Sequence, residues 1–186
     1  MKIGLQITKN REKYSRLLSL IKSDFSRDVD FIHIPDEESL KSNIKNLDAL
    51  VCYGIKKENF EYRSDKLKWI HIGASGVDGN LFSELIKSRV MVTNAKGINA
   101  KPVAEFIMSQ ILYFSKQLYS CETFKHNRKW NQWELAKKTK QLSDLTLGII
   151  GYGEIGKELS KLAKPFGMRV MATRRLQKKI ESKKFV

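Results

Sequence analysis

TLGIIGYGEIG, residues 146–156, is the stretch that decides the fold of this chain. Its first half, Thr146–Ile150, is an apolar run typical of a fully buried parallel strand. Glycines follow at positions 151, 153 and 156, and apolar residues then recur at helical spacing from Ile155 to Phe166. A strand, a Gly-x-Gly-x-x-Gly turn and a helix in this order predict a dinucleotide-binding βαβ unit.

Each glycine has its own physical role in such a turn. Gly151 permits the tight turn, Gly153 lets the backbone approach a pyrophosphate, and Gly156 lets helix and strand pack closely. The N-terminus of the helix then offers its backbone N–H groups to the phosphates. The alternative is a tight glycine turn that binds no ligand.

The second strand of the unit is expected at residues 169–172, and the residues after it bear on the choice of cofactor. An NAD site usually presents an acidic side chain about twenty residues after the glycines. This chain has Thr173, Arg174 and Arg175 there, and a guanidinium can pair with a 2′-phosphate. The sequence therefore favours NADP over NAD. The alternative is that these arginines begin a solvated basic tail.

Composition bounds the class of protein. A length of 186 residues with 41% hydrophobic content suits one globular domain and part of another. Cys52 and Cys121 are too isolated for a disulfide framework or a metal site, so free thiols in a reducing, cytoplasmic compartment are expected. The sequence contains no apolar stretch of signal-peptide or membrane-spanning length, so no membrane partner is expected.

A net charge of +15 raises nucleic acid as a partner. Most lysines, however, alternate with acids on predicted helix surfaces, and no recognition helix or stacking aromatic motif accompanies them. We therefore expect no specific nucleic-acid partner. Only the lysine-rich end of the chain has the charge to bind polyanions, weakly and without specificity.

The first hundred residues alternate short β-branched runs with helical patterns. Strands are predicted at residues 2–7, 31–34, 47–52, 69–72 and 90–93, and helices at 11–22, 37–44 and 81–87. Strands joined by crossover helices predict an α/β fold with a flavodoxin-like parallel sheet. Ligands bind such sheets beyond the carboxyl ends of the strands, where the strand order reverses.

The loop GASGVDG, residues 73–79, follows one of these strands at its carboxyl end. A glycine-rich loop can turn successive backbone N–H groups toward an anion such as a substrate carboxylate. The alternative is a flexible connection in which Gly76 and Gly79 are needed for positive φ angles.

A long apolar-periodic stretch opens at Pro102 and is predicted to run as one helix toward Phe124, bridging two domains. Trp130 and Trp133 follow it and are expected to pack the hinge rather than to stack on a ligand. The predicted domains are residues 1–101 for substrate, 102–143 for the bridging helix and hinge, and 144–186 for a partial Rossmann domain with its first βαβ unit.

Taken together, these motifs resemble the D-isomer-specific 2-hydroxyacid dehydrogenases, which include phosphoglycerate dehydrogenases and glyoxylate or hydroxypyruvate reductases. The segments that carry the resemblance are LKWIHIGASGVD (67–78), VTNAKGIN (92–99), PVAE (102–105) and LTLGIIGYGEIG (145–156). Pro102 departs from the family pattern, because a small or hydroxyl residue often takes that place. The order and spacing of the segments make the match specific over roughly residues 67 to 175.

The resemblance implies a two-domain reductase that passes hydride between a nicotinamide and a small 2-oxo or 2-hydroxy acid in the cleft between the domains. The backbone at Ser75, Gly76 and Val77 would hold the substrate carboxylate. The cofactor would contact the turn and the end of the second strand, through Gly151, Tyr152, Gly153, Glu154, Ile155, Gly156, Thr173, Arg174 and Arg175. Arg174 stands where many relatives place an acid.

The family's catalytic groups are an arginine and a histidine paired with a carboxylate, and the resemblance places all three beyond residue 186. His71 lies in an apolar strand, where a hydrogen-bonded core histidine is favoured over a catalytic one, and neither His33 nor His126 has a partner that the sequence identifies. We therefore expect a C-terminally truncated family member that is inactive alone. Its expected partners are a second copy or a complementing C-terminal polypeptide. The alternative is a non-catalytic nucleotide-binding or dimerisation module.

Overall fold

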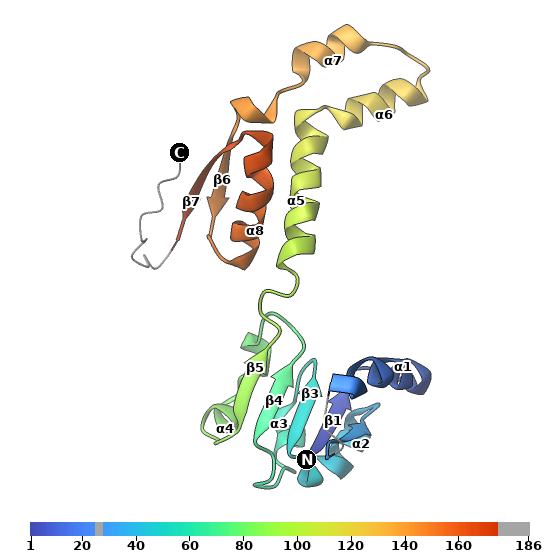
Figure 1. Ribbon diagram of the computed structural model, residues 1–186, viewed down its shortest axis with the longest axis vertical. Coiled ribbons are helices and arrows are strands. Elements are labelled where there is room, and N and C mark those ends of the chain that lie inside the picture. The colour runs from blue at the N-terminus through green and yellow to red at the C-terminus, as the bar shows by residue number, and fades with distance from the viewer. Residues whose placement is uncertain (25–27, 175–186) are drawn as a thin grey trace. The chain divides into compact units, whose positions relative to one another are not determined.

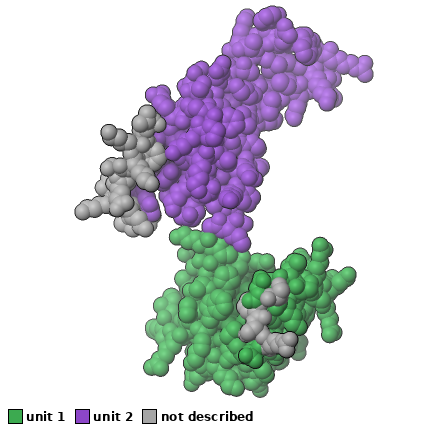
Figure 2. Space-filling model, viewed as in Figure 1, with its two compact units in different colours: residues 1–96 green, residues 97–186 purple. Residues whose placement is uncertain are grey.

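The computed structural model describes residues 1–24 and 28–174 of the chain. The chain forms two compact units, Met1–Lys96 and Gly97–Val186 (Figure 2). Each unit has a hydrophobic core of its own. The roles that the sequence assigns to residues 1–101, 102–143 and 144–186 stay predictions.

A five-stranded parallel sheet forms the first unit (Figure 1). Its strands are β1 (Lys2–Gln6), β2 (Asp30–His33), β3 (Ala49–Cys52), β4 (Trp69–Ile72) and β5 (Met91–Asn94). They lie in the order β2-β1-β3-β4-β5, and every neighbouring pair is parallel. This is the flavodoxin-like order, so the predicted α/β fold with its parallel sheet is confirmed.

Short helices connect these strands. They are α1 (Arg11–Ile21), α2 (Glu37–Asn43), α3 (Lys57–Phe60) and α4 (Ser83–Ile86), with 3-10 turns at Lys22–Asp24, Ile44–Asn46 and Asp78–Asn80. Side chains of Asn10 and Asp36 cap α1 and α2, each by accepting a backbone N–H at 2.8 Å. Helix α3 was not predicted, because a single turn is too short to show a helical period.

The sheet of the first unit buries side chains on both faces. Leu50, Ile70 and Ile72 are fully buried on one face, together with residues of α2, α3 and α4. Ile3 and Leu5 are buried on the other face, where Tyr14 of α1 packs against them. This two-sided burial explains why the strands appear in the sequence as nearly continuous apolar runs.

The second unit begins with helices and ends with a βαβ unit (Figure 1). Its elements are α5 (Ala100–Ser115), α6 (Leu118–His126), α7 (Gln132–Lys138), β6 (Thr146–Ile150), α8 (Glu154–Ala163) and β7 (Arg169–Thr173), with 3-10 turns at Leu142–Asp144 and Lys164–Phe166. Strands β6 and β7 pair in parallel, with Ile150 opposite Thr173. Helix α5 packs on α8, and Ala104 and Ala163 are fully buried in the core between these elements.

The prediction of one long helix from Pro102 toward Phe124 was wrong. Helix α5 ends at Ser115, and Gln117 takes a left-handed conformation with φ of 56° before α6 begins. The N–H groups of Lys116 and Gln117 bond back to the carbonyls of Leu112 and Phe114, which closes the last turn of α5. The chain therefore changes direction where the apolar period alone predicts continuation.

The expected packing of the two tryptophans was also wrong. The side chains of Trp130 and Trp133 are 85% and 75% exposed. Trp130 makes a local hydrogen bond, donating its indole N–H to Gln132 Oε1 at 3.1 Å. The sequence favours a hinge because large aromatic side chains are usually buried, but Trp130, before α7, and Trp133, within α7, both lie on the surface.

Candidate functional site

The glycine turn between β6 and α8 is held by the end of β7. The backbone N–H groups of Gly151 and Tyr152 both donate to the carbonyl oxygen of Thr173, at 3.1 and 3.0 Å. Gly151 has φ of +92°, which a residue with a Cβ rarely adopts. The turn and the residues after β7 are therefore brought together, as a dinucleotide site requires.

Two further glycines of the turn have different surroundings. A Cβ on Gly156 would lie 3.1 Å from the carbonyl oxygen of Gly151 and 3.1 Å from Ile149 Cγ2, so this glycine allows α8 to approach β6. A Cβ on Gly153 would meet no atom within 4 Å. The side of Gly153 is thus open to an approaching ligand.

The N-terminus of α8 faces this open side. Gly153 is the N-cap residue and provides no side-chain cap, and the first helical hydrogen bond runs from Lys157 N to Gly153 O. The backbone N–H groups of Ile155 and Gly156 precede that bond and so have no acceptor within the helix. Such N–H groups, together with the helix dipole, favour a bound anion.

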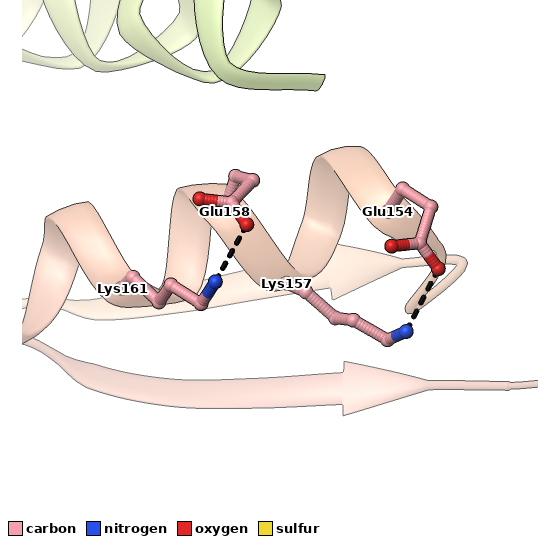
Figure 3. A network of polar contacts seen from close by, with 4 residues as sticks. All are labelled: Glu154, Lys157, Glu158 and Lys161. Carbon is pink, nitrogen blue, oxygen red and sulfur yellow. Dashed lines mark hydrogen bonds and ion pairs between the residues drawn. The ribbon is translucent and has the colours of Figure 1, made fainter. Parts of the chain in front are cut away.

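Charged side chains line the exposed surface of α8 (Figure 3). Glu154, the first residue of the helix, pairs with Lys157 at 2.8 Å, and Glu158 pairs with Lys161 at 2.6 Å. The hydrogen bond to Glu158 raises the pKa of Lys161. A carboxylate therefore stands at the helix end that a pyrophosphate would approach.

The residues predicted to choose between NAD and NADP are Thr173, Arg174 and Arg175, and the structure describes the first two. Thr173 ends β7 and bonds the turn, and Arg174 follows it with an exposed side chain. Arg175 lies outside the described residues. Arg174 therefore directly follows the residue whose carbonyl holds the glycine turn.

The loop after β4 is held by hydrogen bonds in its first three residues and is open around its later glycines. Gly73 N donates to Cys52 O at 2.7 Å, and Asn94 Nδ2 donates to Ser75 O at 2.7 Å. Neither Gly76 nor Gly79 has a positive φ, so the alternative that the loop needs these glycines for that conformation was wrong. A Cβ on either glycine would meet no atom within 4 Å, which leaves room for a ligand close to the backbone.

A crevice of about 870 Å³ lies at the carboxyl ends of β1, β2 and β3. The strand order reverses between β1 and β3, so this is the position at which ligands bind in such sheets. Its lining includes Gln6, Lys9, Asp36, Tyr53, Lys56 and Asn80. Sequence reasoning predicted a crevice at the reversal but named only the loop 73–79, because the lining comes from short loops without a motif.

A hydrogen-bond network supports the polar side of this crevice. Glu37 accepts from Gln6 Nε2 at 3.4 Å and from the buried side chain of Asn59. Asn80 Oδ1 accepts the N–H of Ile55 at 3.2 Å, and a Cβ on Gly54 would lie 2.5 Å from that oxygen. A side chain at position 54 would therefore push the Asn80 amide away from the N–H of Ile55.

Two of the histidines are bound to neighbouring strands or loops. His71 Nδ1 lies 2.9 Å from Thr93 Oγ1, which also accepts the indole N–H of Trp69 at 2.8 Å. His33 stacks on Tyr14 with ring centroids 4.3 Å apart, and its Nε2 donates to the carbonyl of Thr8 at 2.8 Å. No ion pair joins a histidine to a carboxylate within residues 1–24 and 28–174.

The same described residues lack two other kinds of feature. They contain no group of three or more His, Cys, Asp or Glu side chains that could hold a metal ion. Within them, no helix is long and apolar enough to cross a membrane.

Comparisons with known proteins agree with this geometry. Residues 108–186 match the NAD binding domain of the D-isomer specific 2-hydroxyacid dehydrogenases. A glyoxylate reductase of Thermococcus litoralis is 29% identical over 151 residues, which cover 77% of this chain and 46% of that protein. A D-3-phosphoglycerate dehydrogenase of Dictyostelium discoideum is 32% identical over 137 residues, covering 73% of this chain and 33% of that protein.

A solved D-lactate dehydrogenase of Treponema pallidum has a similar fold, with a TM-score of 0.74, 22% sequence identity, and coverage of 96% of this chain and 54% of that one. Fold and glycine turn thus define an α/β protein with a dinucleotide-binding βαβ unit. The chain belongs to the D-isomer-specific 2-hydroxyacid dehydrogenase family. It spans about half, or less, of the length of these relatives.

Proposed function

We propose that this chain provides the substrate-binding and dinucleotide-binding parts of an NAD(P)-dependent oxidoreductase acting on the CH–OH group of a 2-hydroxy acid. One observation supports this most directly. The Thr173 carbonyl holds Gly151 and Tyr152 so that the N-terminus of α8 faces the open side of Gly153. This arrangement falls within the residues that match the NAD binding domain.

The residues present fit a dinucleotide. The pyrophosphate would lie against Gly151, Tyr152, Gly153, Glu154 and Ile155, with Gly156 providing the close packing of α8. The bound nicotinamide supplies the hydride acceptor or donor of the reaction. We propose NADP as the preferred form, because Arg174 rather than an acid follows Thr173.

The first unit would bind the acid. The backbone of Ser75, Gly76 and Val77 is the proposed seat of the substrate carboxylate, since the loop is anchored through Ser75 O yet open at Gly76. The neighbouring crevice of about 870 Å³ offers space for the rest of a small 2-oxo acid.

We further propose that the chain alone does not catalyse the reaction. His33 and His71 are held by Thr8 and Thr93, and neither forms an ion pair with a carboxylate in the described part of the chain. The family resemblance implies a histidine paired with a carboxylate, and a general acid or base must also lie within hydrogen-bond reach of the substrate. We propose that the catalytic groups come from outside residues 1–24 and 28–174.

The cofactor proposal is tested by titrating the chain with NADPH and NADH and following reduced-nicotinamide fluorescence. We expect saturable binding that favours NADPH and is lost in Gly153→Asp, because a carboxylate there fills the open side of the turn and repels phosphate. Arg174→Ala should weaken NADPH about tenfold and leave NADH nearly unchanged. Absence of binding by folded protein, checked by circular dichroism, would contradict the proposal.

A second candidate function is that of a non-catalytic nucleotide-binding or dimerisation module. The exposure of Trp130 and Trp133, at 85% and 75%, favours it, because large exposed aromatic rings are frequent at protein interfaces. Sedimentation analysis of the chain and of a Trp130→Ala, Trp133→Ala variant tests this. A dimer that dissociates in the variant would support the module, whereas a monomer at all concentrations would exclude self-association.

A further inference from the structure

Glu154 places a negative charge at the N-terminus of α8 in the proposed dinucleotide site. It is the first residue of α8, directly after Gly153, at the helix end whose dipole attracts anions. A carboxylate there offsets part of the positive potential that would otherwise act on a pyrophosphate. The same charge stabilises the helix through its dipole. Glu154 therefore favours helix stability and disfavours phosphate binding.

Lys157 forms an ion pair with Glu154. Its Nζ lies 2.8 Å from Glu154 Oε1, and Figure 3 shows its side chain extending back toward the first turn of α8. Both side chains are close to half exposed, at 42% for Lys157 and 48% for Glu154, so the pair is solvated and can rearrange. An anion at the helix end would place Lys157 between two negative groups.

We infer that Glu154 and Lys157 form a charge gate on the dinucleotide site, in which Glu154 weakens binding and Lys157 turns from Glu154 to the incoming pyrophosphate. This inference rests on the proposed cofactor function of the glycine turn. It adds to that function that the Glu154–Lys157 ion pair sets how tightly the cofactor binds.

Helix α8 contains a matched control for this pair. Glu158 and Lys161 have the same i,i+3 spacing, a similar distance of 2.6 Å, and a position one turn further from the glycines. Removing the charge of Glu158 changes the net charge of the chain as much as removing that of Glu154. The two variants therefore differ in the position of the lost charge and not in its size.

The test measures NADPH and NADH binding by fluorescence at low and high salt. Glu154→Gln should tighten binding about fivefold at low ionic strength and less in 0.5 M salt, because a nearby charge is removed and salt screens it. Glu158→Gln should stay within about twofold of the unaltered chain. The melting temperature of Glu154→Gln should fall by about one to four degrees, since the helix loses its N-terminal acid.

The variant Lys157→Met tests whether Lys157 contacts the pyrophosphate or only neutralises the charge of Glu154. In the unaltered chain it should weaken binding about fivefold, because the site loses a cation beside the phosphates. In the Glu154→Gln background, Lys157→Met should still weaken binding, because Lys157 then interacts with the pyrophosphate and no longer with a carboxylate at position 154. No effect in that background would overturn the transfer of Lys157 to the pyrophosphate.

Other outcomes separate this inference from the proposed function. If the chain binds NADPH and Glu154→Gln binds it equally well or more weakly, the gate is wrong and the cofactor site stands. If the chain fails to bind and Glu154→Gln binds, the gate is supported. If the unaltered chain and every variant are folded and none binds, the cofactor site and the gate are both wrong.

Discussion

At the scale of single residues, the glycines of the turn differ in what they can tolerate. Gly156→Ala should lower the free energy of unfolding by about 1 kcal/mol, because its Cβ would lie 3.1 Å from the Gly151 carbonyl and push α8 away from β6. The matched change Gly148→Ala introduces a methyl with no atom within 4 Å, so it should be neutral or stabilising by about 0.5 kcal/mol. Urea unfolding of both variants measures the difference. Equal effects would contradict the packing role of Gly156.

Cys52 gives the first unit a pH dependence. Burial raises the pKa of its thiol from 9.0 to about 11, with a smaller contribution from the charge of Glu37. Between pH 9 and 11 the unfolded chain loses a proton that the folded chain keeps, so the free energy of unfolding falls as pH rises through this window. The loss due to Cys52 should be about 1 kcal/mol between pH 8 and 10.

The comparison with Cys52→Ala isolates this effect from the many lysines and tyrosines that titrate in the same range. The variant should be less stable at pH 8, because a fully buried side chain is shortened, and its stability should fall less steeply toward pH 10. Parallel pH profiles would contradict the link between the thiol and stability.

Residue-level prediction from sequence succeeded where a motif fixed the backbone and failed where none did. Gly151 has a positive φ and Gly156 lies in close contact with neighbouring atoms, as the motif predicts, whereas the approach of a pyrophosphate to Gly153 stays a prediction. Gly76 and Gly79 were considered as positive-φ positions, yet neither has a positive φ. Gly54 packs against the side chain of Asn80, but it belongs to no sequence motif. Its close contact with Asn80 therefore could not be predicted from the sequence.

At the scale of elements, the break between α5 and α6 shows the limit of periodicity. Apolar residues continue at helical spacing through Ile111, Phe114 and Leu118, and no Gly or Pro marks the break. Gln117 takes a left-handed conformation there, which the residue type does not signal in the sequence. The strands, by contrast, were found because runs buried on both faces are apolar throughout.

Gln117 is therefore a site where glycine should stabilise the chain. Gln117→Gly removes the strain of a positive φ and should raise the free energy of unfolding by about 0.5 to 1 kcal/mol. The control is Gln110→Gly inside α5, which should lower it by about 1 kcal/mol, because glycine is a poor helix former. Thermal unfolding followed by circular dichroism measures both. If both variants destabilise the chain, Gln117 is not strained.

At the scale of the whole molecule, the two units are distinguished by charge as well as by core. Basic residues are scattered among acids in Met1–Lys96, whereas the excess of lysine and arginine is concentrated in Gly97–Val186. The βαβ unit within that second part presents Ile150 and Met171 at 97% and 68% exposure. Exposed apolar side chains on a two-stranded sheet are a surface that further strands or a partner can cover.

Separate cores predict that the two units respond separately to core mutations. Phe60 is fully buried in the first unit and Met108 is 5% exposed in the second, and no residue is shared between their hydrophobic clusters. We expect calorimetry to show two transitions. Phe60→Leu should lower one transition and Met108→Ala the other, each by several degrees, because each change leaves a cavity in one core.

The control for helix α5 is Phe106→Ala, whose side chain is 65% exposed and whose loss should move neither transition by more than about a degree. The cofactor adds a second readout. If NADPH binds only the glycine turn, it should raise the transition that Met108→Ala lowers and leave the other unchanged, since a ligand stabilises the unit that binds it. A single transition lowered by both core variants would show instead that the two units unfold as one cooperative body, so that any ligand bound by one also stabilises the other.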